Sequence, residues 1–223
     1  MKTKFFLKTI IAALFFPVLL FAIAGTLDFF QGWIFLLTTL LTALMNYATI
    51  RNDPALMTER SQAGPGAKSW DKIILGLSGM TYLCAIAVAG LDSGKHHWSP
   101  DFHWTLYALA IILTILGHVI FLTARKENKY FSSVVRIQKD RNHQVCDTGI
   151  YQVVRHPGYA GMMLSLAAFP LLTGSVWSGI PVMVSIILLL IRTELEDRTL
   201  QSELNGYIQY TQKSRYKIIP YIW

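Results

Sequence analysis

The stretch Arg141–Gly161, RNHQVCDTGIYQVVRHPGYAG, concentrates side chains that can bind a charged and partly aromatic ligand. It lies between two long apolar segments, where polar groups at this density favour a binding site. Aromatic rings can stack on a planar base and attract a cation, while imidazole and guanidinium groups can hydrogen-bond a carboxylate or a ribose. The side chains that could make such contacts are His143, Tyr151, Arg155, His156 and Tyr159.

Pro157 and Gly158 mark the start of the helix that follows this stretch. Backbone amides at a helix start form a natural anion site, so this turn could add hydrogen-bond donors to the ligand site. Gly149 and Gly161 allow a tight turn and a close approach of the backbone. The residues alone also allow a second interpretation, in which the stretch is an interfacial turn whose Tyr and His side chains only anchor the helix.

A second polar cluster, RTELEDRTLQSEL, follows the last apolar segment. Its members Arg192 and Glu196 are spaced i and i+4 and therefore share one helix face. An exposed ion pair at this spacing would contribute only about 0.3–0.5 kcal/mol. The cluster emerges directly from an apolar segment, where charge is costly unless it has a function, so we interpret the pair as functional. The solvated face of the same helix is expected to carry Glu194, Arg198 and Glu203.

The composition favours a membrane protein, since 53% of the 223 residues are hydrophobic and the mean hydropathy is +0.41. Four apolar segments are long enough to cross a hydrocarbon core of about 30 Å, and two shorter ones are joined by Thr173-Gly174-Ser175. We therefore predict an all-α, multi-pass membrane helical bundle of six spans. Its last two spans form a tight helical hairpin, and its cofactor pocket is cytoplasmic. The predicted spans are Phe5–Thr26, Phe29–Ile50, Ile73–Leu91, His103–Ala124, Tyr159–Thr173 and Val176–Ile191.

The Lys and Arg residues orient this bundle. With six spans, all 20 of them except Lys95 lie on the membrane side that carries both termini. The positive-inside rule makes that side cytoplasmic. Five spans, with the last hairpin fused, would place the second polar cluster outside and are rejected on charge. The net charge of +7 is thus explained by topology and by affinity for anionic lipid headgroups, and it does not indicate nucleic-acid binding.

Two cytoplasmic connections have features of their own. Asn52-Asp53-Pro54 predicts a short surface helix over Ala55–Arg60, because Asp is a good N-cap and Pro suits the first helical position. Arg125–Ile150 is the longest connection. It should fold over the cytoplasmic mouth of the bundle, since Arg136 and Gln138 are too polar to enter lipid.

Other residue types favour packing or solvent over chemistry. The histidines of the external connection, His96 and His97, are expected to be solvated. Cys84 and Cys146 form no disulfide framework and lack the spacing of metal ligands. We therefore predict no metal site.

The two ends of the chain are expected to lie at the membrane. Tyr207, Tyr210 and the segment Pro220–Trp223 should form a tail that packs back on the membrane surface. The basic and then apolar N-terminus also fits a signal peptide, whose cleavage would leave the orientation of the later spans unchanged.

The run HQVCDTGIYQVVRHPGYAG, followed by RTELED, GYIQY and the closing IIPYIW, resembles the isoprenylcysteine carboxyl methyltransferase family. That family belongs to a wider group of integral-membrane methyltransferases that includes phospholipid N-methyltransferases. The resemblance covers the C-terminal part of the chain, and the first half is similar only as generic membrane helices. It implies S-adenosyl-L-methionine as cofactor. The positions that match the family's cofactor-binding residues are Gln138, His143, Tyr151, His156, Pro157, Gly158, Tyr159 and Glu196.

The resemblance also implies roles for the charged residues. Arg192 and Glu196 would be catalytic, with Arg192 contacting the substrate and Glu196 the cofactor. Arg155 matches the pattern and is expected to bind substrate, with lipid-headgroup anchoring as the alternative role. Asp197 stands where many relatives have a second Glu, so it keeps the charge but shortens the reach, and its role stays open.

These roles imply a methyl transfer to a lipophilic acceptor. Residues 1–125 would form the four N-terminal membrane helices, and residues 126–223 the catalytic region. A carboxylate or thiolate acceptor is already ionised near neutral pH, so the protein must chiefly align it with the donor methyl and exclude water. The acceptor, a lipid or lipophilic small molecule, would enter from the bilayer. Isoprenylcysteine carboxylates, lipid amines, isoprenoid acids and lipophilic thiols all remain open as acceptors.

Two other functions compete with methyl transfer. Some sterol reductases share a similar C-terminal arrangement, so a membrane reductase using NADPH is the first alternative, and a non-catalytic membrane scaffold is the second. The short chain lacks targeting signals and glycosylation sequons, which suits a bacterial inner membrane with both termini cytoplasmic. The oligomeric state is not predicted.

Overall fold

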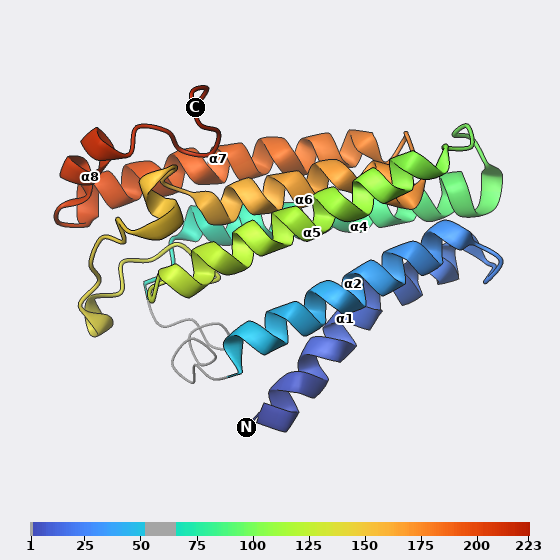
Figure 1. Cartoon of the computed structure of the whole chain (residues 1–223), viewed down its shortest axis with the longest axis horizontal. Coiled ribbons are helices and arrows are strands. Elements are labelled where there is room, and N and C mark those ends of the chain that lie inside the picture. Colours follow the sequence, from blue (N-terminus) through green and yellow to red (C-terminus); the bar gives the residue numbers. More distant parts are fainter. Residues whose placement is uncertain (1, 52–65) are drawn as a thin grey trace.

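The computed structural model describes residues 2–51 and 66–223, and within these ranges it contains helices, turns and loops but no β-strand. The prediction of an all-helical protein is therefore confirmed for the described residues. The predicted surface helix over Ala55–Arg60 lies outside them. The helices, shown in Figure 1, are α1 Lys2–Ala24, α2 Phe30–Ile50, α4 Ser69–Ala89, α5 Trp104–Glu127, α6 Pro157–Thr173, α7 Gly179–Glu203 and α8 Tyr207–Lys213.

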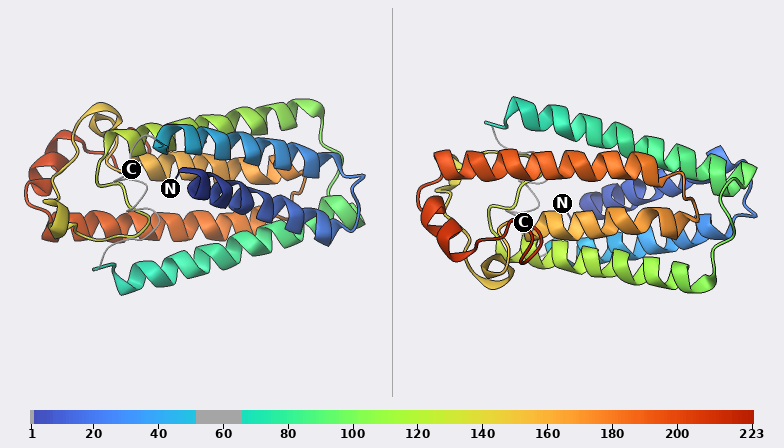
Figure 2. Two further views of the ribbon diagram at one scale, coloured as in Figure 1. Left: turned by 90° about the horizontal axis from the view of Figure 1, so that it is seen from below. Right: turned by 90° about the horizontal axis from the view of Figure 1, so that it is seen from above.

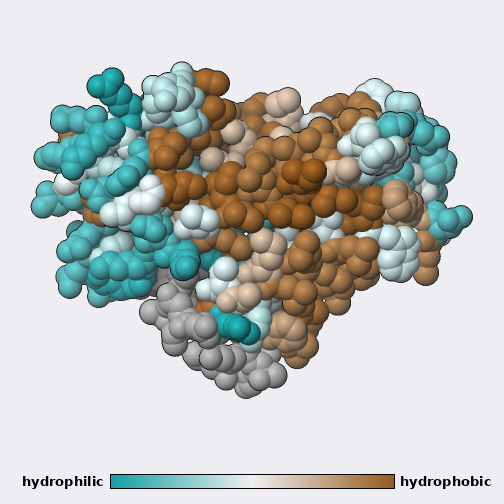
Figure 3. Space-filling view, viewed as in Figure 1, coloured by the Kyte–Doolittle hydropathy of each residue, from teal (hydrophilic) through white to brown (hydrophobic). Residues whose placement is uncertain are grey.

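Within residues 2–51 and 66–223, four helical stretches are long and apolar enough to cross a membrane: Phe6–Ala24, Phe30–Ile50, Ser69–His96 and Trp104–Glu127. Their outward side chains include exposed Leu, Ile, Phe and Met, which water would not favour. Figure 3 shows a hydrophobic band across the middle of the bundle, with hydrophilic residues gathered at its two ends. These features indicate an integral membrane protein.

Helices α5 and α6 lie close together because both carry glycine at their crossing. A Cβ atom at Gly117 would come within 2.5 Å of the Gly161 carbonyl oxygen, so any side chain would force the two helices apart. The bundle core next to this contact is aromatic. The rings of Phe35 and Tyr82 each have their centroid 5.6 Å from that of Phe169, and they join α2 and α4 to α6.

The α6–α7 hairpin turns at Gly174, whose φ of +66° lies in the left-handed region that favours glycine. A buried carboxylate holds this turn to the loop after α4. Asp92 accepts hydrogen bonds from Ser99 N (2.7 Å), Ser99 Oγ (2.6 Å) and Ser175 Oγ (2.5 Å). The helical run of α4 also continues beyond the predicted span as a π-helical segment, Gly90–His96.

The opposite end of the bundle is built from the connection between α5 and α6 together with α8 and the C-terminal tail (Figure 2). Helix α7 runs without a break from its apolar half into this polar end, so Arg192 and Glu196 stand on a helix and not on a loop. The predicted surface tail is wrong for two of its residues. Tyr207 and Tyr210 are buried against Ala124 and Tyr151 inside the polar end, because their rings fill the space below the connection.

Candidate cofactor and acceptor site

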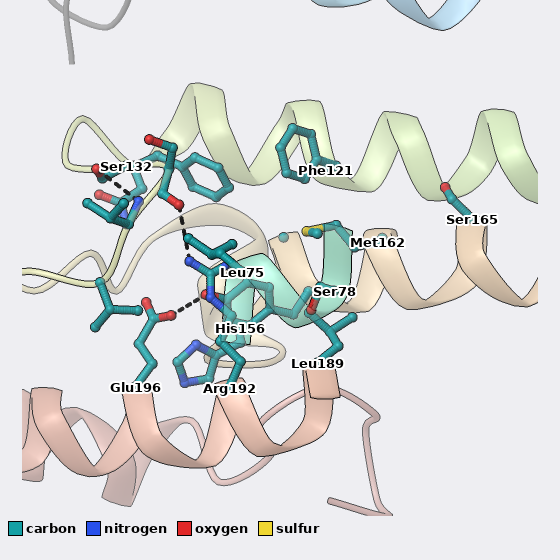
Figure 4. A pocket seen from close by; sticks show the side chains of 18 of the residues that line it. Leu75, Ser78, Phe121, Ser132, His156, Met162, Ser165, Leu189, Arg192 and Glu196 are labelled. Carbon is teal, nitrogen blue, oxygen red and sulfur yellow. Dashed lines mark hydrogen bonds between the residues drawn. The ribbon is translucent and has the colours of Figure 1, made fainter. Parts of the chain in front are cut away.

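A cavity of about 710 Å³ opens in the polar end and continues between the helices of the bundle. Its walls come from α2, α4, α5, α6, α7 and α8 and from the connection after α5. Figure 4 shows Arg192 and Glu196 on α7 beside His156, with Phe121 on α5 and Met162 on α6 also in its wall. All but Pro157 of the site residues predicted from the sequence line this cavity: Gln138, His143, Tyr151, Arg155, His156, Gly158, Tyr159, Arg192 and Glu196.

Gln138 and His143 are joined by a tight turn in which Asn142 adopts a left-handed conformation, with φ of 50°. His143 N donates to Gln138 O (3.2 Å), and Gln138 N donates to His143 Nδ1 (3.3 Å). Burial and the nearby charges of Arg136 and Arg141 lower the pKa of His143 to about 4. The imidazole is therefore neutral near pH 7, and its Nε2–H can serve as a hydrogen-bond donor.

The amide group of Gln138 is already engaged. Its Nε2 donates to Tyr130 O (2.5 Å), and its Oε1 accepts from Arg141 Nη1 (2.7 Å). These bonds fix the connection where it passes over the cavity, so in this structure the Gln138 side chain holds the loop in place.

Tyr151 lies between α5 and α8. Its hydroxyl donates to Ala124 O (3.3 Å), and its carbonyl accepts a hydrogen bond from Tyr210 Oη (2.6 Å). Burial raises the pKa of Tyr151 well above its ordinary value, so the phenol is neutral. Its ring contributes an aromatic surface to the cavity wall.

His156 and Tyr159 present parallel rings, with centroids 5.8 Å apart and planes inclined by 10°. The Tyr159 hydroxyl donates to Glu196 Oε2. Helical spacing places both residues on the cavity side of the α6 start, because His156 is the N-cap and Tyr159 lies in the first turn. Together they form an aromatic corner with the Glu196 carboxylate beside it.

The start of α6 offers fewer free amides than the sequence indicated. The amides of Tyr159 and Ala160 both donate to His156 O, at 3.0 and 3.1 Å. Gly158 is required for a different reason, since a Cβ atom there would lie 2.8 Å from the Phe131 ring. Pro157 occupies the first helical turn, where its missing N–H costs nothing.

Asp197 is the centre of a buried network, although the sequence left its role open. Its two oxygens accept from Arg155 Nε (2.8 Å) and Nη2 (3.0 Å), Tyr207 Oη (3.0 Å) and Gln201 Nε2 (2.7 Å). His156 Nε2 lies 3.1 Å from Oδ1. Burial raises the pKa of Asp197, but the hydrogen bonds of His156 and Arg155 outweigh burial and hold it well below its ordinary value.

Arg155, which was expected to bind substrate, lines the cavity with its guanidinium hydrogen-bonded to protein groups. Besides the paired bonds to Asp197, its Nη1 donates to Ser214 O (2.9 Å) and Arg215 O (2.7 Å). The guanidinium therefore links α7 to the C-terminal tail, and the residue is 7% exposed. In the structure the guanidinium contacts only these protein groups among the described residues, and its role as a substrate ligand stays a prediction.

Arg192 does not pair with Glu196, in contrast to the simple i, i+4 interpretation. Its Nε donates to Asp71 Oδ1 (2.7 Å) and its Nη2 to Ser133 O (3.1 Å). Its Cζ lies 5.2 Å from the Tyr159 ring centroid. Asp71 is fully buried and also accepts from Val135 N (2.8 Å), so it joins α4, α7 and the connection.

Asp71 is the residue that sequence reasoning missed. A carboxylate in the first turn of α4 is typical of an ordinary helix-dipole partner. The sequence feature that could have identified Asp71 is its position at the start of an apolar helix, where a charge needs a partner. With Asp71 balancing Arg192 and Asp197 balancing Arg155, Glu196 forms no salt bridge in the described part of the chain. The site can thus offer one carboxylate to a cationic ligand.

The model of the isoprenylcysteine carboxyl methyltransferase family matches residues 106–202, which include the first polar cluster and all but the last two residues of the second. The C-terminal part of the chain is therefore similar to this family. Protein-S-isoprenylcysteine O-methyltransferase B of Arabidopsis thaliana is 29% identical over 63 residues, which is 28% of this chain and 32% of that protein. A probable protein-S-isoprenylcysteine O-methyltransferase of Oryza sativa subsp. indica is 30% identical over 63 residues, or 28% of this chain and 33% of that protein.

The matched region thus spans about a third of the length of these isoprenylcysteine methyltransferase relatives. The resemblance found in the sequence is confirmed at the level of the family. Asp71 lies outside the segment that the family model matches, so the partner of Arg192 comes from a part of the chain that this family match does not cover.

Proposed function

We propose that this protein is an integral-membrane, S-adenosylmethionine-dependent methyltransferase that acts on a lipophilic acceptor. The observation that carries the proposal is one cavity that begins among polar and aromatic residues of the family-matched region and continues into the apolar bundle. Such a cavity can receive a water-soluble donor from one end and a lipophilic acceptor from the other.

The residues at the polar end fit S-adenosylmethionine. Glu196 offers a carboxylate without a salt-bridge partner in the described part, which suits the donor's ammonium or ribose. The rings of His156, Tyr159 and Tyr151 suit its adenine face and its cation. The neutral His143 can donate a hydrogen bond to its carboxylate or ribose. When bound, S-adenosylmethionine would supply an electrophilic methyl group on a sulfonium.

The acceptor would approach this methyl group from the membrane side. Arg192 lines the cavity next to Tyr159, with Nε and Nη2 held by Asp71 and Ser133. Among the described residues Nη1 has no hydrogen-bond partner. We propose that it binds an acceptor oxygen and positions a carboxylate such as that of isoprenylcysteine. The connection after α5 closes over the site and keeps water out, which favours an in-line displacement.

Donor binding tests this function. Purified protein in detergent should bind S-adenosylmethionine saturably by calorimetry, because the proposed site has both aromatic and carboxylate contacts. His96→Ala, far from the cavity at the other end of the bundle, should bind equally well. Saturable NADPH binding without S-adenosylmethionine binding would identify a reductase instead. Binding of neither cofactor would favour a non-catalytic membrane scaffold.

The orientation of the bundle is a second part of the proposal. Six spans, with α6 and α7 as the last two, place both termini and the cavity mouth in the cytoplasm, in keeping with a bacterial inner membrane. Residues 1–125 then carry four membrane helices and residues 126–223 the catalytic region. The charge asymmetry predicts that a reporter fused after Gly94 is external and one after Trp223 cytoplasmic. A cytoplasmic signal at Gly94 would contradict this orientation.

A further inference from the structure

The inner part of the cavity is lined by hydroxyl groups at the depth of the apolar bundle. We call these residues the hydroxyl belt. They come from α2, α4, α5, α6 and α7, and each lies in the middle turns of its helix or, for α7, of its apolar half. The belt consists of Thr38, Thr42, Ser78, Thr114, Ser165 and Ser185.

Part of the belt is satisfied by the protein itself. Thr114 Oγ1 donates to Ala110 O (2.8 Å), and Ser185 Oγ lies 2.7 Å from Thr81 Oγ1. Thr42 Oγ1 donates to Thr39 O (3.0 Å). Bonds of this kind are common in membrane helices and would by themselves indicate only helix packing.

Two polar groups in the same region lack partners. Among the described residues, no hydrogen bond involves the hydroxyl of Thr38, a side chain that is 6% exposed and lines the cavity. Nε2 of His118, on the facing helix α5, is buried and also without a partner. Because a buried polar group without a hydrogen bond is costly, a ligand that supplies the missing partner would be favoured here.

Three belt residues lie at similar distances from the proposed reaction centre. Ser185 lies about two helical turns before Arg192 on α7, and Ser78 about two turns after Asp71 on α4, each about 10 Å along the axis. Ser165 lies somewhat less than two turns after Tyr159 on α6, about 9 Å. Three helices thus place belt hydroxyls at one depth.

We infer that the hydroxyl belt is a second recognition site for the acceptor, and that the acceptor carries a hydrogen-bonding oxygen about 10 Å from its methylated group. A purely hydrocarbon tail would leave the Thr38 hydroxyl unpaired, whereas a tail with an oxygen at this distance would satisfy it. This inference rests on the proposed function and specifies the acceptor class.

A matched pair of neutral probes tests the inference. Methyl 8-hydroxyoctanoate carries a hydroxyl about 10 Å from its ester, since eight bonds in an extended chain span that length. Methyl nonanoate replaces the hydroxyl with a methyl group. The ratio of their dissociation constants is measured by calorimetry in the parent protein, Thr38→Val, Ser78→Ala and Thr123→Val. Comparing ratios cancels the different partitioning of the probes into detergent.

The hydroxyl probe should lose roughly three- to tenfold of its relative affinity in Thr38→Val and Ser78→Ala, as expected for one lost hydrogen bond. Thr123→Val is the control, because Thr123 is an exposed residue of α5 that does not line the cavity. An unchanged ratio in Thr38→Val and Ser78→Ala, or no saturable binding of either probe, would overturn the inference. S-adenosylmethionine binding is measured on the same samples and reports separately on the proposed function. The probe measurement does not depend on methyl transfer, because neither probe has to be methylated.

Discussion

Replacing Asp197 by asparagine should lower the free energy of unfolding by about 3–5 kcal/mol, because the buried Arg155 would keep its charge without a counter-ion. Asparagine preserves the size of the side chain, so loss of packing contributes little. The matched control is Glu203→Gln, whose partner Lys68 is at the surface. That change should cost less than about 1 kcal/mol. Thermal and denaturant unfolding in detergent measure both variants.

The same pair predicts how stability depends on pH. The folded-state pKa of Asp197 lies well below its ordinary value of 3.8, so its contribution is fully present above that value. It is lost as the pH falls through the folded-state pKa. Titration of Asp197 itself should therefore leave the stability difference between parent and Asp197→Asn unchanged from about pH 5 to 8. Equal stability of Asp197→Asn and Glu203→Gln would mean that the hydrogen-bond network around Asp197 does not stabilise the fold.

The helices could be predicted because they follow from local sequence. Long apolar runs must form backbone hydrogen bonds within themselves when they cross lipid, so hydropathy alone gives their existence and approximate ends. Gly174 likewise indicates the α6–α7 turn. The extension of α4 through His96 could not be predicted, because it depends on Asp92 and Ser175, which are far apart in sequence and meet only in the folded bundle.

The site could be predicted only in part, because its charge partners are also far apart in sequence. The family resemblance supplied residues from the matched segment, and these gather around one cavity. It gave no information on charge partners. Helical spacing favours i and i+4 contacts and so pairs Arg192 with Glu196, whereas the actual partner Asp71 is brought in by α4. The contacts of Arg155 to the C-terminal tail are likewise non-local, so the sequence could not predict them.

Two neighbouring charges on α7 should have separable functions. Glu196→Gln removes the carboxylate proposed to hold the donor, so S-adenosylmethionine affinity should fall roughly ten- to hundredfold, as expected for a lost charge-assisted hydrogen bond of about 1.5–3 kcal/mol. Arg192→Lys keeps the positive charge beside Asp71 but cannot hold both Asp71 and Ser133 as the planar guanidinium does. Donor affinity should then survive while methyl transfer to a carboxylate acceptor falls by a similar factor.

Glu194→Gln provides the matched control for both variants. Glu194 is on the same helix but faces outward, where it pairs with Arg198 (2.7 Å) and Lys217. Calorimetric donor binding and turnover at saturating acceptor are measured side by side. Glu194→Gln should leave both nearly unchanged, because exposed pairs contribute little. Parent-like binding and turnover in Glu196→Gln and Arg192→Lys would instead mean that the two charges only stabilise the bundle, and that methyl transfer takes place elsewhere.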